Sequence, residues 1–428
     1  MKQSMAVLVL GLGLGLAGCD GGGGPADDVV EDDRVTADTG PDEPGADMPA
    51  DPDAPDAADT ETDEAPAGIS WSLEDPPEKN TDRALPCCQA AEDTFMAVLT
   101  YYRDTAAPVG DLNTLYHMER LFHGMTGVYE VTGDEEIVSN LLDISLQVIG
   151  AGEDLDGDGC LDYCFRDADG TVNGECDSED GVMPTYPWRA MRGLARTLKA
   201  VRNSSLYESR SGDFEALRDF LWTDVIDKWL DLDGDGPDAG LRGSDTAGIL
   251  SRMAGILLDY YYATGNAAAG QLAGEWISRI STDMEPSTAV EGAYVFDNWV
   301  RDAPLGEPAD TSHSNEIVVA LIEGFEAGLL TYAFIEPLHG TLLEVMWNGD
   351  AASPQFSEFV DGTGGLFPAQ VVMGWMRLGQ FKRETQQVSE AVDYSTSYDL
   401  ETIEANGNLC RIFGLALTDY PLPPPDGD

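Results

Sequence analysis

The stretches YEVTGD (residues 129–134) and YYATGN (residues 261–266) decide the fold of this chain. Each follows an apolar helical pattern, reaches a glycine and continues with Asp or Asn. Glycine readily adopts the left-handed conformation that ends a helix, and Asp and Asn are preferred caps of the next helix. The two stretches therefore predict tight turns between antiparallel helices. FEAG (residues 325–328) is a degenerate third copy.

Apolar side chains recur every three or four residues through most of the chain, which is the spacing of one helix face. The predicted helices are 90–103, 112–129, 135–151, 188–203, 214–229, 249–260, 267–282, 314–328, 335–347, 368–379 and 401–417. Alternating strand patterns are scarce. Helical hairpins stacked side by side bury a continuous core. We therefore expect an all-α fold, an (α/α) toroid of about six helical hairpins.

The first nineteen residues have the layout of an export signal. Lys2 precedes an apolar run over residues 5–16, and Leu16-Ala17-Gly18-Cys19 follows, which looks like a lipobox. The run is too short to span a bilayer as a permanent helix. We expect cleavage before Cys19, lipidation of Cys19, and a protein anchored to a bacterial membrane, facing the periplasm or the cell exterior. An ordinary secretory signal is the alternative.

The amino-acid composition indicates where the stalk, the folded domain and the tail begin and end. Residues 20–70 hold seventeen Asp or Glu against one basic residue, Arg34, with many Pro, Ala and Gly. Such a segment cannot offset its ordering entropy by apolar burial, so we expect a disordered acidic stalk. The folded domain is expected over 71–420, and 421–428 as a disordered tail. The net charge of −56 argues against nucleic acid as a partner.

Cysteine usage agrees with export. Besides Cys19 there are six cysteines, an even number suited to disulfides in an oxidising compartment. Cys160, Cys164 and Cys176 share one loop, and we expect one bridge among them. Adjacent Cys87 and Cys88 are not expected to bond to each other.

The hairpin stretches, the segment GAYVF (residues 292–296) and the segment DTSHSN (residues 310–315) together resemble the (α/α) toroid enzymes that act on polysaccharides. The resemblance covers roughly residues 89–375. It implies a ring of helical hairpins with a substrate groove at one end. It also implies a glycan as partner, and it extends over polysaccharide lyases, epimerases and glycosidases.

The richest chemistry lies between residues 291 and 316. Aromatic rings there could stack on a sugar, an arginine could neutralise a carboxylate, and a histidine titrates near neutrality. The predicted catalytic residues are Tyr294, Arg301, His313 and Asn315, and the predicted substrate-binding residues are His117, Trp188, Arg189, Phe296, Trp299 and Asn348. The competing interpretation is a long loop whose aromatics fill the core.

Three functions fit these residues. In a uronate lyase, Arg301 or Asn315 would neutralise the sugar carboxylate while His313 or Tyr294 takes the neighbouring proton. This grouping favours the lyase interpretation slightly. In a glycoside hydrolase, two carboxylates would act as acid and base, with Asp297, Asp310 and Glu316 as the candidates. In the third alternative, the protein binds a glycan or a protein at the surface without turnover.

Two acidic loops resemble the first half of a calcium-binding EF-hand loop. Carboxylates alternate along each loop and a glycine stands at the sharp turn. The predicted Ca²⁺ ligands are Asp154, Asp156, Asp158 and Asp162 in the first loop, and Asp231, Asp233 and Asp235 in the second. Phe165 and Arg242 stand where the bidentate glutamate belongs, so another ligand would be needed. A solvated acidic turn is the alternative.

If Ca²⁺ stiffens either loop, chelation should lower the melting temperature, because a ligand that binds only the folded state stabilises it. The measurement is a thermal melt with and without chelator at fixed ionic strength. Identical melting curves would contradict structural calcium.

Overall fold

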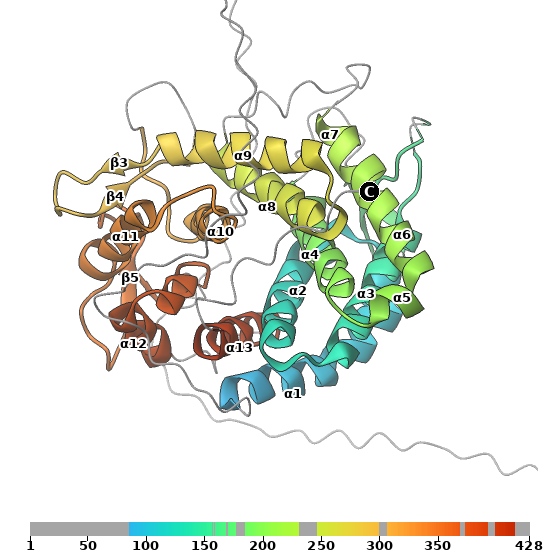
Figure 1. Ribbon diagram of the computed structural model, residues 1–428, viewed down its shortest axis with the longest axis horizontal. Helices are drawn as coiled ribbons and strands as arrows, with labels where there is room; N and C mark the ends of the chain where they lie inside the picture. Colours follow the sequence, from blue (N-terminus) through green and yellow to red (C-terminus); the bar gives the residue numbers. More distant parts are fainter. Residues whose placement is uncertain are drawn as a thin grey trace, which may run out of the picture. The chain divides into compact units, whose positions relative to one another are not determined.

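The helices of the chain form two concentric layers (Figure 1). The computed structural model describes residues 85–155, 157, 159–167, 170–176, 185–230, 246–298, 306–368, 373–392 and 399–415. These residues belong to one unit, Glu64–Asp428. Along the chain, an outer helix alternates with an inner one, as expected for a toroid built from helical hairpins.

The inner elements are α2 (Leu112–Thr132), α4 (Thr185–Arg202), α8 (Ala247–Thr264), α10 (Ser314–Glu326), the 3₁₀ helix η6 (Trp375–Gln380) and α13 (Asp399–Gly414). The outer elements are α1 (Pro86–Tyr101), α3 (Glu135–Ala151), α6 (Ser211–Phe220), α9 (Ala267–Thr282), α11 (Tyr332–Gly340) and α12 (Arg383–Ala391). Shorter helical pieces are η1 (Tyr102–Ala106), η2 (Ala107–Val109), α5 (Leu206–Ser209), η3 (Leu221–Asp227), α7 (Lys228–Leu230) and η4 (Thr341–Met346).

Contacts between the inner elements run in a closed cycle. α2 packs on α4, α4 on α8, α8 on α10, α10 on η6, η6 on α13, and α13 again on α2. The outer helix α1 pairs with the last inner helix, α13. A disulfide between Cys88 on α1 and Cys410 on α13 joins the two ends of the fold across 322 residues of sequence. The ring expected from the hairpin pattern is confirmed.

The two repeated stretches form the same turn. Gly133 has φ 68° and donates its N–H to the carbonyl of Tyr129 at 2.8 Å, and Gly265 has φ 74° and donates to Tyr261 at 2.8 Å. The next residue caps the following helix: Asp134 accepts from the N–H of Glu136, and Asn266 from that of Ala269. Both turns therefore reverse the chain from an inner to an outer helix.

The two ends of the ring differ in loop length. Inner helices lead to outer ones through short connections such as 133–134, 265–266 and 327–331. Outer helices lead back to inner ones through long connections at 152–184, 231–246, 283–313 and 347–374, parts of which lie outside the described residues. We call these the short-loop end and the long-loop end. Binding sites are commonly formed by loops that a rigid scaffold holds in place, which draws attention to the long-loop end.

Three small antiparallel sheets occur among the described residues, one in each of three long connections. They pair β1 (Cys164–Arg166) with β2 (Val172–Cys176), β3 (Glu285–Pro286) with β4 (Tyr294–Val295), and β5 (Gln355–Ser357) with β6 (Leu366–Pro368). The helix expected over 368–379 is wrong in its first part, because Pro368 ends β6 and η6 begins only at Trp375. The outer helix α12 was not predicted, because its sequence RETQQVSEA is mostly polar.

Small residues let two inner helices approach closely. A Cβ on Gly124 of α2 would lie 2.3 Å from the carbonyl oxygen of Ile403, and a Cβ on Gly407 of α13 would lie 2.2 Å from that of Gly124. Real side chains do not tolerate such distances, so this contact requires glycine. Among the described residues, no helix is both long and apolar enough to span a membrane.

The disulfide between Cys88 and Cys410 should be the more stabilising of the two disulfides. In the chain-entropy view a cross-link stabilises more when it closes a longer loop, and the Cys164–Cys176 bridge spans only 12 residues. We expect the double variant Cys88→Ala/Cys410→Ala to lose about 3–5 kcal/mol of unfolding free energy, and Cys164→Ala/Cys176→Ala about 2–3 kcal/mol. Denaturant unfolding of both variants checks the order, and the reverse order would contradict this explanation.

Candidate functional site at the long-loop end

Charged side chains line the inner face of the ring at helical spacing. Each inner helix carries such a stripe alongside its apolar residues. The charged residues are Glu119 and Glu130 on α2, with Tyr116 and His123 on the same helix; Arg189, Arg192, Arg196 and Lys199 on α4; Arg252 and Asp259 on α8; Glu316, Glu323 and Glu326 on α10; Arg377 alone on η6; and Glu401, Glu404 and Arg411 on α13. The inner face of the ring therefore carries an ion-pair network, while the apolar residues of the same helices belong to the hydrophobic core.

Glu323 is the hub of this network. Its carboxylate pairs with Arg192 at 2.7 Å, with Arg377 at 2.9 Å and, more closely still, with Arg196. Although burial acts to raise the pKa of Glu323, these three guanidinium groups hold that pKa well below its usual value. One carboxylate thus ties together α4, α10 and η6.

The ion pairs show that the inner helices run in the same direction. Arg120 near the start of α2 pairs with Glu401 near the start of α13 at 2.6 Å, and Arg411 near the end of α13 pairs with Glu130 near the end of α2 at 3.2 Å. The N-termini of α2 and α13 therefore lie at the same end of the ring, the long-loop end, and the alternation of inner and outer helices along the chain places the other inner N-termini there as well.

Glu119 is a deeply buried acid at this end. Its side chain is 3% exposed and lies 3.8 Å from Nε of Arg189 and 3.5 Å from Nε2 of His123. Burial, with Glu316 acting in the same direction, raises the pKa of Glu119 to about 7. Burial also lowers the pKa of His123 well below its usual value, so this imidazole is neutral.

Glu316 and Glu404 are more accessible than Glu119, each with a side chain 13% exposed, the same fraction as Glu323. Although burial acts to raise it, the guanidinium groups of Arg192, Arg252 and Arg189 hold the pKa of Glu316 below its usual value. Burial raises the pKa of Glu404 to about 7. Near neutral pH the site therefore combines an ionised carboxylate with carboxyl groups that hold a proton part of the time.

The sequence carried a signal for this cluster. Arg189, Arg192, Arg196 and Lys199 follow a spacing of three, four and three, which is one face of a helix. A basic stripe of that kind is normally assigned to solvent. The ring turns it inward, because the matching acids lie on other inner helices up to 131 residues away in sequence.

The predicted catalytic residues are not brought together by the described contacts. Tyr294 packs on Phe334 of α11, with ring centroids 5.4 Å apart, and its backbone bonds to Thr341. Asn315 uses its side chain to accept from the N–H of Gly374 and donate to the carbonyl of Ser312. Arg301 lies outside the described residues. The structure therefore gives Tyr294 and Asn315 structural contacts.

His313 is placed differently, at the start of α10 on the long-loop end. Its Nδ1 lies 2.5 Å from Oδ2 of Asp310, and its side chain is 53% exposed. Although burial acts to raise it, hydrogen bonds from His313 and Ser312 hold the pKa of Asp310 below its usual value. The histidine is thus oriented by a carboxylate and open to solvent.

Two of the predicted sugar-stacking rings belong to the core. Trp188 is fully buried with its ring edge-to-face against Trp229, and Phe296 is fully buried and stacks on Trp375. Neither ring has a face left for a sugar, which corrects these two assignments. Trp299 lies outside the described residues.

Of the other predicted substrate-binding residues, His117 and Arg189 lie at the long-loop end, which we also call the mouth of the ring, and Asn348 lies in a surface turn. Arg189 lies 3.9 Å above the ring of Tyr116, whose edge meets the exposed His117, so all three lie at the long-loop end. Asn348 is engaged in a turn, where its side chain accepts from the N–H groups of Asp350 and Gln355.

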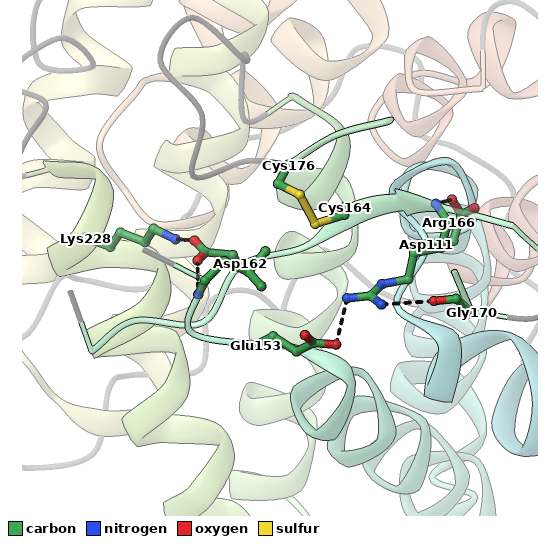
Figure 2. Close-up of a disulfide and its surroundings, with 9 residues drawn as sticks. Asp111, Glu153, Asp162, Cys164, Arg166, Gly170, Cys176 and Lys228 are labelled. Carbon is green, nitrogen blue, oxygen red and sulfur yellow. Dashed lines mark hydrogen bonds and ion pairs between the residues drawn. A yellow bond between two sulfur atoms is a disulfide. The ribbon is translucent and has the colours of Figure 1, made fainter. Parts of the chain in front are cut away.

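The first acidic loop is held by protein groups (Figure 2). Asp162 is fully buried, pairs with Nζ of Lys228 at 2.6 Å and accepts from the N–H of Leu155. The lysine supplies a positive charge beside Asp162, and calcium binding by this loop stays a prediction. Asp154 accepts from the N–H of Gly157. Within the part of the chain that the structure describes, no group of three or more His, Cys, Asp or Glu could hold a metal.

The remaining predicted ligands, Asp156, Asp158, Asp231, Asp233 and Asp235, lie outside the described residues. The bridge expected among Cys160, Cys164 and Cys176 is confirmed as Cys164–Cys176, which joins β1 to β2 beside the Arg166–Glu153 ion pair (Figure 2).

No protein-family model and no curated protein sequence matches this chain. Among solved structures, it is similar to an inactive variant of an alpha-1,6-mannanase of Salegentibacter sp. HEL1_6 in complex with alpha-1,6-mannotriose, at 12% identity and a TM-score of 0.41 over 77% of this chain and 99% of that one. It is also similar to a glycosyl hydrolase family 88 protein from Bacteroides vulgatus, at 11% identity and a TM-score of 0.29 over 77% of this chain and 99% of that one. Similarities this distant carry no conclusion about the reaction of the present chain.

The raised pKa of Glu119 should make the folding stability depend on pH. Because the folded-state pKa of about 7 exceeds the ordinary value of 4.5, protonation stabilises the fold fully below about pH 4.5. This contribution is lost as the pH rises through 7. In Glu119→Gln, the melting temperature should therefore fall less between pH 5 and pH 7 than in the wild type. Parallel pH profiles for the two proteins would contradict the buried, protonated state of Glu119.

Proposed function

We propose that the protein is a glycan-active enzyme that hydrolyses glycosidic bonds at the long-loop end of the ring. The observation that carries the proposal is the pair Glu316 and Glu404, which are accessible to the same degree and have pKa values displaced in opposite directions. Two carboxyl groups with separated pKa values are what glycoside hydrolysis requires. The likeness of the hairpin and loop motifs to polysaccharide-active toroids supports the same conclusion.

The roles follow from the protonation states. Glu404, which holds a proton part of the time at neutral pH, donates that proton to the oxygen of the leaving sugar as the glycosidic bond breaks. Glu316, which is ionised, either takes a proton from the attacking water or attacks the anomeric carbon itself. Arg192, at 2.8 Å from Glu316, keeps this carboxylate ionised and fixes its position. Tyr116, beside Arg189, supplies an aromatic side chain at the same mouth.

Uronate-lyase chemistry is the second candidate, and the exposed His313–Asp310 pair favours it. A histidine oriented by a carboxylate is suited to removing a proton from a substrate carbon. The two reactions give different products, since elimination leaves an unsaturated sugar end and hydrolysis leaves a saturated one.

The cellular setting proposed for this activity follows from the sequence alone. Lipidated at Cys19, the enzyme would work outside the cytoplasm on a stalk formed by residues 20–70. That position suits a polymeric glycan that does not enter the cell.

Neutral and uronate-containing polysaccharides should be screened for saturated and unsaturated ends. On the substrate that is cleaved, Glu316→Gln and Glu404→Gln should each lower kcat by about 100-fold or more, because each removes an acid–base group. Saturated ends are the expected product.

Glu130→Gln is the matched control, because it makes the same change in the same network at the short-loop end, where Glu130 pairs with Arg411. It should keep near wild-type activity. Two results together would contradict hydrolysis and support the lyase mechanism. These are unsaturated sugar ends in the product, and a loss of turnover in His313→Ala but in neither glutamate variant.

A further inference from the structure

Arg252 is a buried arginine on the inner face of the ring. It lies on the inner stripe of α8, three residues before Gly255, whose missing Cβ leaves room for the guanidinium of Arg192. Only 3% of the surface of Arg252 is exposed to solvent. Among the described residues, none forms a hydrogen bond or an ion pair with it, and its Nε is buried without a hydrogen-bond partner. The other arginines of the inner face, on α4, η6 and α13, all have carboxylate partners.

Such an arrangement is costly in a folded protein. A buried charge normally persists only where an opposite charge or hydrogen bonds compensate it. The neighbouring acids Glu316 and Glu119 compensate this charge only in part, because they act on Arg252 electrostatically without a hydrogen bond to it. Glu316 bonds to Arg192, and Glu119 is directed at Arg189 and His123. Arg189 adds a second positive charge nearby, which together with burial lowers the pKa of Arg252.

We propose that Arg252, assisted by Arg189, binds the carboxylate of an acidic sugar, so that the substrate of this site is a uronate-containing glycan. The planar fork of a guanidinium matches a planar carboxylate and can bind it through two hydrogen bonds. The inference rests on the proposed function for its place in the substrate, since Arg252 interacts electrostatically with the catalytic Glu316.

The charge near Arg252 differs from the charge of the whole chain, and this bears on whether an anionic glycan can bind. A chain with a net charge of −56 should repel a polyanion. Arg189, Arg192 and Arg252 instead gather beside Glu119 and Glu316, where burial makes the protonated form of Glu119 accessible. With Glu404, whose pKa is also raised, three guanidinium groups face three carboxyl groups, so the site carries less negative charge than the surface around it.

The test measures binding in the Glu404→Gln background, so that turnover does not consume the probe. The probe is a glucuronate-containing tetrasaccharide, compared by calorimetry with a neutral tetrasaccharide and a sulfated one of the same length. Arg252→Met should weaken binding of the glucuronate probe by about 10- to 100-fold, the usual value of a charge-assisted hydrogen bond. Its effect on the neutral probe should be less than about 2-fold.

A stability measurement separates this role from a structural one. Arg252→Met should keep or raise the melting temperature, because it removes a buried charge that forms no ion pair or hydrogen bond with any described residue. The matched control Lys199→Met should lower it, because Lys199 is paired with Asp259 at 2.9 Å. If Arg252→Met does not fold, Arg252→Lys keeps the charge without the fork and should still weaken glucuronate binding by about 10-fold.

Equal affinity for glucuronate and neutral probes, or unchanged glucuronate affinity in Arg252→Met, would overturn the inference. Tighter binding of the sulfated probe would overturn the carboxylate assignment. If the probe is recovered intact after the titration, these results are independent of whether Glu316 and Glu404 prove catalytic.

Discussion

The carboxylate of Glu323 is the contact on which the rest of the site depends. It is shared by Arg192, Arg196 and Arg377, which come from two other inner elements. Charges so far from solvent are stable only when they are paired, and removing one partner of such a group commonly costs about 3–5 kcal/mol. The ring can therefore close only in the register that brings these stripes together. The same pairs fix Arg192 against Glu316 at the long-loop end.

The ion pairs that stabilise the ring and the groups proposed for its chemistry lie at opposite ends. At the short-loop end, acids and bases match, as in Lys199 with Asp259 and Arg411 with Glu130. At the long-loop end the matching is incomplete, since Glu119 and Glu404 have raised pKa values and Arg252 has no partner among the described residues. Perturbed groups that converge at one mouth are typical of a functional site rather than of a core.

The fold could be predicted from local signals, whereas the site could not. The glycine turns at 133 and 265, and the exact limits of α3 and α9, follow from residues within a few positions of each other. The ion-pair network instead joins residues such as Arg192 and Glu323, which no local pattern connects. The sequence directed attention to aromatic residues at 188 and 296, but burial in the core removes both from the site. His313 could be named from the sequence because a histidine in a long loop is a local signal, and its role in a site stays a prediction.

The central claim is that glycan binds across the long-loop end, between α8, α10 and α13. A crystal structure of the Glu404→Gln protein with a glucuronate-containing tetrasaccharide tests it most directly. We predict sugar density at this mouth, with a carboxylate bonded to Arg252 and a glycosidic oxygen within hydrogen-bond distance of residue 404. Sugar bound elsewhere on the ring, with the mouth filled only by water, would contradict the account.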